Sequence, residues 1–147
     1  MIDITSQSLT TLVENIKDKK LSSEEVTKAF VDRSQKSKEL NAYISKDFSS
    51  AIEKARKFDE SPNLDLKLPG IPMAVKDLFC TKDIRTTAGS KILENFIPTY
   101  ESTVTQNIWN EGAILLGKLN CDEFAMGSSN ETSFYGCLLY TSPSPRD

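Results

Sequence analysis

The first sixty residues alternate between apolar and polar positions with the period of a helix. The apolar side chains within 9–16 recur at helical spacing and predict a first helix. Ser22 is followed three residues later by Glu25, the pairing of a capping box, which predicts the start of a second helix. A third helix is predicted over 51–58, before the polar, proline-containing segment 61–63.

Short apolar runs predict three strands. One covers 42–44, a second covers 73–75 after the rigid turn 68–72, and a third covers 113–116. Between the last two runs, residues 103–111 carry apolar side chains at helical spacing. The order strand, helix, strand predicts a parallel, helix-covered sheet of the α/β class.

Two organisations of the chain fit this pattern. Residues 1–67 could form an autonomous helical unit, or they could decorate the α/β core that begins at residue 68. We favour the second arrangement and expect 1–67 to be the N-terminal helical segment of one domain, with 68–136 as the first part of its core.

Composition narrows the possible chemistry. The chain has 147 residues, 38% of them hydrophobic, and a formal net charge of −3, so it offers no excess of basic charge for nucleic acid. It contains no histidine, which removes every His-dependent triad, and its three cysteines form no CxxC pair. We expect a cytoplasmic protein without a membrane segment, in which lysine, carboxylates or serine move protons.

Lys76 is the residue that we expect to do chemistry. It ends an apolar run that begins at Ile71, and burial in a strand would favour the neutral amine, which can act as a general base. Asp77 would point to the opposite face and bind backbone or loop groups instead. The alternative is that Lys76 and Asp77 lie on the solvated rim of a sheet, and the pattern leaves both open.

Two polar loops follow the predicted strands. Asp122 and Glu123 could suggest a metal or acid–base site, but adjacent carboxylates do not face one point, so we expect Asp122 to cap a helical turn and no metal to bind. Thr86, Thr87 and Ser90 could contact a polar substrate, but local turns are the favoured interpretation.

Three segments taken together resemble the amidase signature family: LPGIPMAVKD at 68–77, TTAGS at 86–90 and GAILLGKLNCDEFAMGS at 112–128. The resemblance runs from near the amino terminus to Gly136. It implies an α/β fold of N-terminal helices followed by the start of a mixed, helix-covered sheet.

The resemblance also implies a mechanism. In the family a lysine, here Lys76, acts on a serine held by a cis peptide bond, and that serine relays the proton of a nucleophilic serine. The residues implied for substrate binding are Met126, Gly127 and Ser128, in the loop that lines the amide pocket.

Segment 122–133 is most similar to the family branch that releases ammonia from glutamine for tRNA-dependent amidation. The implied partners are glutamine, the B and C subunits of an amidotransferase, and mischarged tRNA bound through the B subunit. ATP and Mg²⁺ are used by the partner subunit, and no cofactor is implied for this chain itself.

Both family serines belong to a Gly-Gly-Ser-Ser-Gly-Gly motif and a following glycine-rich loop, which this sequence does not contain. We therefore expect a truncated fragment that is inactive by itself, with Val75, Ile114 and Leu115 less buried than in a full domain. Residues 137–147 could be a flexible Ser-Pro tail. They can, however, be encoded by a DNA sequence that resembles a transposase adapter used to prepare sequencing libraries, so we expect a non-native tail.

Three functions remain open from the sequence. The first is the glutamine amidohydrolase subunit, and the second is a stand-alone amidase of the same family. The third is a small, non-catalytic α/β interaction domain in which Lys76 has only a structural role.

Overall fold

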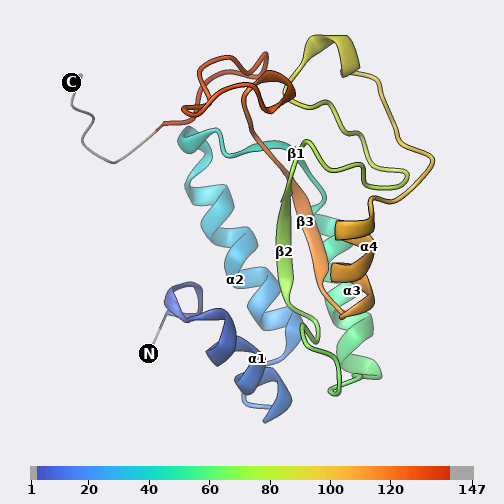
Figure 1. The fold of residues 1–147 in the computed structure, drawn as a ribbon. Helices are drawn as coiled ribbons and strands as arrows, with labels where there is room; N and C mark the ends of the chain where they lie inside the picture. The colour runs from blue at the N-terminus through green and yellow to red at the C-terminus, as the bar shows by residue number, and fades with distance from the viewer. Residues whose placement is uncertain (1–2, 140–147) are drawn as a thin grey trace.

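The computed structural model describes residues 3–139, which form four α-helices and a three-stranded sheet (Figure 1). The elements in chain order are η1 (Ile4–Ser6), α1 (Leu9–Lys17), α2 (Ser23–Lys36), η2 (Lys38–Leu40), β1 (Tyr43–Lys46), α3 (Phe48–Glu60), β2 (Pro72–Lys76), η3 (Lys91–Leu93), α4 (Thr103–Asn110), β3 (Ile114–Leu119) and η4 (Glu123–Ala125). The expected helices and strands are thereby confirmed. Within residues 3–139, no helix has the length and apolar character needed to cross a membrane.

The local signals at the helix ends act as the sequence predicts. The Ser22 hydroxyl accepts a hydrogen bond from the N–H of Glu25, and the Glu25 carboxylate accepts one from the N–H of Ser22, so the capping box is present. Asp59 adds a tertiary cap, because its carboxylate accepts from the N–H groups of Ser23 and Glu24, both at 2.9 Å. The start of α2 is therefore fixed both by its own residues and by α3.

The sheet is mixed, with strand order β1-β3-β2. β2 runs parallel to β3 and β1 runs antiparallel to it, which confirms the expected mixed α/β sheet. The strand predicted over 113–116 extends to Leu119, because residues 117–119 pair with both neighbours. Residues 117–119, the second half of β3, are thus paired on both sides.

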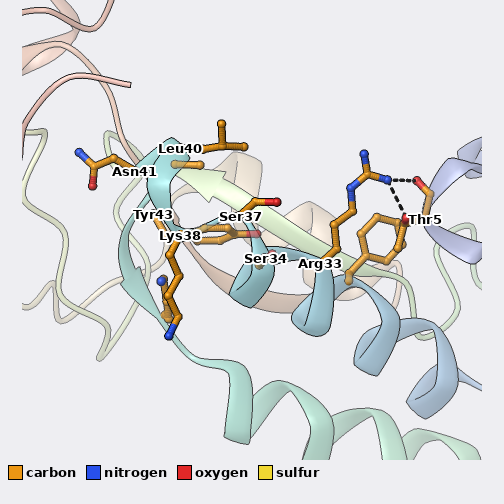
Figure 2. Close-up of a pocket in the computed structure, with 11 residues that line it drawn as sticks. Thr5, Arg33, Ser34, Ser37, Lys38, Leu40, Asn41 and Tyr43 are labelled. Atoms are coloured by element: carbon orange, nitrogen blue, oxygen red, sulfur yellow. Dashed lines mark hydrogen bonds between the residues drawn. The ribbon is translucent and has the colours of Figure 1, made fainter. Parts of the chain in front are cut away.

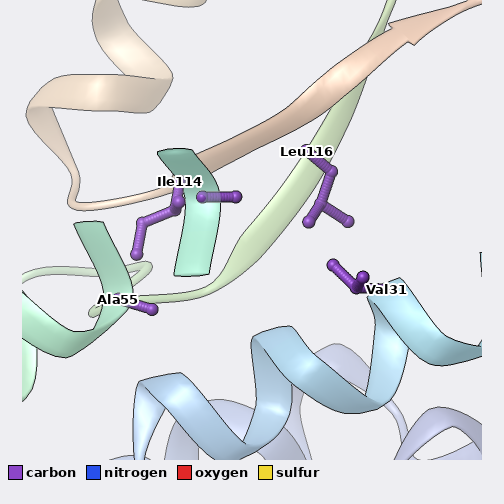
Figure 3. Packing of buried hydrophobic residues seen from close by; sticks show 5 residues of the cluster. Val31, Ala55, Ile114 and Leu116 are labelled. Atoms are coloured by element: carbon purple, nitrogen blue, oxygen red, sulfur yellow. The ribbon is translucent and has the colours of Figure 1, made fainter. Parts of the chain in front are cut away.

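Helices α2 and α3 pack on this sheet (Figures 1 and 3). The buried cluster that joins them consists of Val31 from α2, Ala51 and Ala55 from α3, and Ile114 and Leu116 from β3. The two alanines leave room for α3 to lie close to the sheet. The helices before residue 67 and the strands after it therefore share one core.

The apolar strand residues are more buried than expected. The relative exposure of Val75, Ile114 and Leu115 is only 7%, 6% and 5%. The expectation that these side chains would be left partly uncovered is wrong, and for Ile114 the cover comes from α2 and α3. These strands are thus buried within the described residues themselves.

Gly70 joins the start of β2 to the start of α2. Its carbonyl accepts a hydrogen bond from the buried hydroxyl of Ser23 at 2.6 Å, and its N–H donates to the carbonyl of Gly112 at 3.0 Å. Its φ of +65° favours glycine, and a Cβ there would lie 2.5 Å from Ser23 Oγ and 2.7 Å from Phe58 Cδ1. A side chain at this position is excluded by both backbone conformation and space.

We predict that Gly70→Ala lowers the free energy of unfolding by more than the roughly 1–2 kcal/mol that a left-handed backbone alone costs an L-residue. The excess arises because the methyl group displaces Ser23 and Phe58. Urea unfolding followed by circular dichroism measures the change.

Gly136→Ala is the matched control. Gly136 also has a positive φ, of +90°, but an added Cβ would meet only the Asn41 side-chain nitrogen, at 3.2 Å. We expect this variant to show the backbone cost alone. Equal losses in the two variants would contradict the packing argument.

Candidate active site

Lys76 lies at the end of β2, and its side chain is exposed. The N–H of the next residue, Asp77, donates to the carbonyl of Leu119 at 2.9 Å. The chain then turns, and the N–H of Phe79 donates to the carbonyl of Lys76 at 3.1 Å. The predicted burial of Lys76 is therefore wrong in this chain, because the apolar run that precedes it ends at the rim of the sheet.

Asp77 is fully buried. Its Oδ2 accepts hydrogen bonds from the N–H of Thr87 at 2.9 Å and from the Thr87 hydroxyl at 2.5 Å. The expectation that Asp77 binds loop groups is confirmed. Burial raises the pKa of Asp77, while the hydrogen bonds from Thr87 and the charge of Lys118 act in the opposite direction.

The buried lysine of this chain is Lys118, on β3. Its side chain is 0% exposed, and its Nζ donates to the carbonyl of Phe79 at 2.5 Å and to the hydroxyls of Thr81 and Thr86 at 2.9 Å each. The Oδ1 of Asp77 lies 3.8 Å from the same Nζ. Burial lowers the pKa of Lys118, and the charge of Asp77 opposes that shift.

The burial of Lys118 has a signal in the sequence that resembles the signal for Lys76. Lys118 interrupts the otherwise apolar or small-residue segment 113–119, just as Lys76 ends an apolar run. The two patterns are nearly the same, and only the pairing of β3 with both β1 and β2 distinguishes an interior position from an edge.

The loops after β2 and β3 are hydrogen-bonded to each other. The N–H of Ala88 donates to the carbonyl of Asp77 at 2.9 Å, and the carbonyl of Ala88 accepts from the N–H of Phe124 at 2.8 Å. Gly89 has a φ of +68°, and a Cβ there would lie 2.5 Å from the carbonyl oxygen of Cys121. Glycine therefore permits the backbone of one loop to lie directly against the other.

The hydroxyl-bearing loop 86–90 bonds within the protein. The Thr86 hydroxyl donates to the carbonyl of Ile84 at 3.1 Å, a local turn of the expected kind. The Ser90 hydroxyl instead donates to the Glu123 carboxylate at 2.5 Å, across the two loops. Thr86, Thr87 and Ser90 are all buried, so in this chain they hold the loops rather than face solvent.

Asp122 braces the loop after β3. Its carboxylate accepts hydrogen bonds from the N–H of Asn130 at 2.8 Å and from the N–H and hydroxyl of Thr132 at 3.2 and 2.9 Å. It makes no side-chain bond to the helical turn 123–125, so the predicted cap is wrong. The N–H of Asn130, followed by the groups of Thr132, lowers the pKa of Asp122.

Met126, Gly127 and Ser128 lie in this braced loop and are exposed, Met126 to 74%. A Cβ at Gly127 would overlap the carboxylate of Asp122, so the chain passes directly over that group. Because β2 and β3 are parallel, Lys76 and this loop lie at the same end of the sheet, where both strands finish (Figure 1). The structure thus places the four expected site residues at one end of the fold.

The carboxylate of Asp122 is bound by groups of the protein itself. Across residues 3–139, no three side chains of His, Cys, Asp or Glu gather closely enough to hold an ion. Asp122 is occupied by backbone and hydroxyl donors instead.

A separate groove of about 250 Å³ lies along the last turns of α2 and the start of β1 (Figure 2). Phe30 and Tyr43 form its apolar lining, and Arg33 donates to the Thr5 hydroxyl at 2.6 Å at one end. Among the described residues that line it, none belongs to the loops that carry the expected site. The groove is therefore distinct from the Lys76 edge of the sheet.

Comparison with known proteins gives consistent results. A model of the Amidase family matches residues 25–139. The A subunit of glutamyl-tRNA(Gln) amidotransferase from Pelagibacter ubique is 78% identical over 136 residues, and the same protein from Hyphomonas neptunium is 52% identical over 138 residues. Each alignment covers 92% of this chain but only 28% of the relative.

Solved structures share the fold. The A subunit of glutamyl-tRNA(Gln) amidotransferase from Thermotoga maritima is 30% identical with a TM-score of 0.72, covering 94% of this chain and 28% of that protein. The peptide amidase of Stenotrophomonas maltophilia is 26% identical with a TM-score of 0.76, covering 90% of this chain and 29% of that protein.

The chain spans a little over a quarter of the length of the curated relatives that it matches. The family match itself extends over most of the 147 residues, from α2 through β3 and the loop beyond it. This chain belongs to the amidase family.

Proposed function

We propose that this chain is part of a glutamine amidohydrolase subunit. The whole protein would supply ammonia for converting Glu-tRNA(Gln) or Asp-tRNA(Asn) to Gln-tRNA(Gln) or Asn-tRNA(Asn). The observation that carries the proposal is the 78% identity to the amidotransferase A subunit of Pelagibacter ubique over 136 residues. The activity is proposed for the whole protein and not for these 147 residues alone, which contain neither family serine.

Lys76 is the proposed general base of this reaction. A lysine can take a proton at neutral pH only when its ammonium form is disfavoured, which requires that the amine be shielded from water. Since this chain spans 28% of its relatives, shielding of the amine is assigned to parts of the whole protein outside these residues. The geometry here contributes a fixed position for Lys76 at the edge where the two loops meet.

Met126, Gly127 and Ser128 are proposed to line the amide pocket. Their loop is exposed yet braced from below by Asp122, an arrangement that presents main-chain groups to a small polar ligand. The expected ligand is the side-chain amide of glutamine.

The partners and location are part of the same proposal. The B and C subunits of the amidotransferase would complete the assembly, with mischarged tRNA bound through the B subunit. ATP and Mg²⁺ would be used by that partner, and the complex would be cytoplasmic. The support is that the most similar relatives named above are themselves subunits of a glutamyl-tRNA(Gln) amidotransferase.

A stand-alone amidase is the second candidate. The specific observation in its favour is that the fold is at least as similar to a peptide amidase, with a TM-score of 0.76, as to an amidotransferase A subunit, with 0.72. The fold therefore does not separate the two functions, whereas sequence identity favours the amidotransferase. Ammonia release from glutamine with and without the B subunit tests the choice, because only a member of that complex should depend on its partner.

We predict that Lys76→Ala in the full-length protein leaves folding intact and lowers amide hydrolysis by about 10²–10⁴, the contribution expected of a general base. The fold is expected to be retained because Lys76 does not belong to the buried cluster that joins α2 and α3 to the sheet. The rate of ammonia release from glutamine is the measurement.

Lys82→Ala is the control, since Lys82 is an exposed lysine in the loop that follows β2. It should hydrolyse glutamine at the parental rate. Near-normal turnover by the Lys76 variant would overturn the role assigned to that amine.

The carboxylate of Asp122 generates a pH prediction. Because hydrogen bonds lower the pKa of Asp122 in the fold, they stabilise the loop at and above the ordinary carboxyl range, and this stabilisation is lost as pH falls through the lowered pKa. We expect the amide chemical shifts of Asn130 and Thr132 to stay constant from neutral to mildly acid pH and to move only at lower pH.

Asp122→Asn should abolish that acid transition, whereas Asp65→Asn, at an exposed carboxylate, should leave it in place. Persistence of the transition in the Asp122 variant would show that another group orders the loop.

A further inference from the structure

The mechanism proposed above gives no role to the buried amine of Lys118. It lies on the central strand β3, and its side chain has no exposed surface. Three oxygens surround its Nζ within hydrogen-bond distance, from Phe79, Thr81 and Thr86. All three belong to the segment that follows Lys76.

These hydrogen bonds favour the ammonium form of Lys118, against the lowering of its pKa by burial. The Thr81 hydroxyl donates its proton to the carbonyl of Phe79 at 3.2 Å, and the Thr86 hydroxyl donates to the carbonyl of Ile84 at 3.1 Å. Both hydroxyl oxygens are thus left as acceptors toward Lys118, and a carbonyl only accepts. Three acceptors require three N–H donors, which the ammonium has and the neutral amine lacks.

Asp77 supplies the opposite charge. Its Oδ2 is held by Thr87, while its Oδ1 has no hydrogen-bond partner within residues 3–139 and lies 3.8 Å from Lys118 Nζ. A buried carboxylate without a nearby cation is strongly disfavoured. Asp77 also directly follows Lys76, so an uncompensated charge there acts on the proposed base.

We propose that Lys118 is a positioning residue for amide hydrolysis: its buried ammonium fixes the turn after Lys76 and neutralises Asp77, the carboxylate next to the base. This inference rests on the function proposed above. Lys118 acts through Asp77 and the turn, and it does not itself contact the substrate.

Several other groups face this pair. Arg85 acts on Asp77, while Cys80, Glu101 and Cys121 act on Lys118. Both cysteines are free thiols, and burial raises the pKa of Cys121. Glu101 is engaged by the Thr105 hydroxyl and by Trp109 Nε1 at 3.2 Å. Asp77 is therefore the carboxylate that lies nearest to Lys118 in the described ion pairs, and it should dominate the response to substitution.

The experiment uses the full-length protein that contains this chain, assembled with its partner subunits. Lys118→Met keeps the length of the side chain and removes its charge. We expect kcat for glutamine to fall about tenfold to 10²-fold, the effect of a misplaced catalytic group, with KM changed little.

The pH–rate profile separates positioning from a merely structural role. Without the cation, burial favours the neutral form of Asp77, so Lys118→Met is judged by kcat and KM, and the profile is compared in Asp77→Asn, where the unbalanced charge of Lys118 disfavours the protonated form of Lys76. Asp77→Asn leaves Lys118 positive, so the acid limb should move to lower pH. The double variant removes both charges and should return the limb close to its parental position.

Two further variants keep the test decisive. Lys82→Met removes an exposed lysine from the same loop and should match the parent in rate and profile. Thr86→Val removes one of the three acceptors of Lys118 with little change in shape, and it should lower kcat less than Lys118→Met does. If Lys118→Met does not fold, Thr86→Val still tests the effect on kcat, and Asp77→Asn still tests the shift of the acid limb.

An acid limb that stays in place in Asp77→Asn, or a Lys118 variant that behaves like Lys82→Met, overturns the proposal. A second substrate, propionamide, separates this failure from failure of the proposed function. If the parent hydrolyses propionamide but not glutamine, the substrate assignment is wrong while the same variants still test Lys118. If the parent hydrolyses neither amide, amide hydrolysis is wrong and the positioning role falls with it.

Discussion

A positive charge buried beside the central strand is the constraint on which the site end of this structure depends. The Lys118 ammonium is withdrawn from water, and such a charge persists only where every N–H has a partner and a counter-charge is near. The chain meets both conditions with the turn that follows β2. Removing one member of a buried ion pair typically costs about 3–5 kcal/mol, so this requirement fixes the path of that turn far more firmly than its own loop sequence could.

The neighbouring loop is likewise organised by a charged side chain that needs hydrogen-bond partners. Asp122 gathers main-chain N–H donors from Asn130 and a hydroxyl from Thr132, and Asp77 does the same with Thr87. Two carboxylates thus replace regular secondary structure as the organisers of irregular backbone. The exposed residues of the two loops, which belong to neither helix nor strand, are therefore held in defined positions at one end of a rigid sheet.

The elements that depend on local chemistry could be predicted from sequence. The start of α2 follows from Ser22 and Glu25, which lie within one turn, and the strands follow from short apolar runs. The burial of Lys76 and Lys118 could not be assigned correctly, because each lies in a similar apolar context. What separates them is strand order: Lys118 belongs to a strand paired on both sides, whereas Lys76 ends an edge strand of the described sheet. The role of Asp122 was hidden for a related reason, since its partners lie eight and ten residues further on.

The strand order has a consequence for how the chain is made. β3 is the centre of the sheet and yet the last of its three strands to be synthesised, so β1 and β2 have no partner until the ribosome has passed residue 119. The apolar faces of α2 and α3, which pack against β3 in the folded protein, stay uncovered by it during the same interval. A nascent chain whose central strand is synthesised last exposes apolar surface for longer. It therefore depends more on chaperones than a chain whose neighbouring segments pair at once.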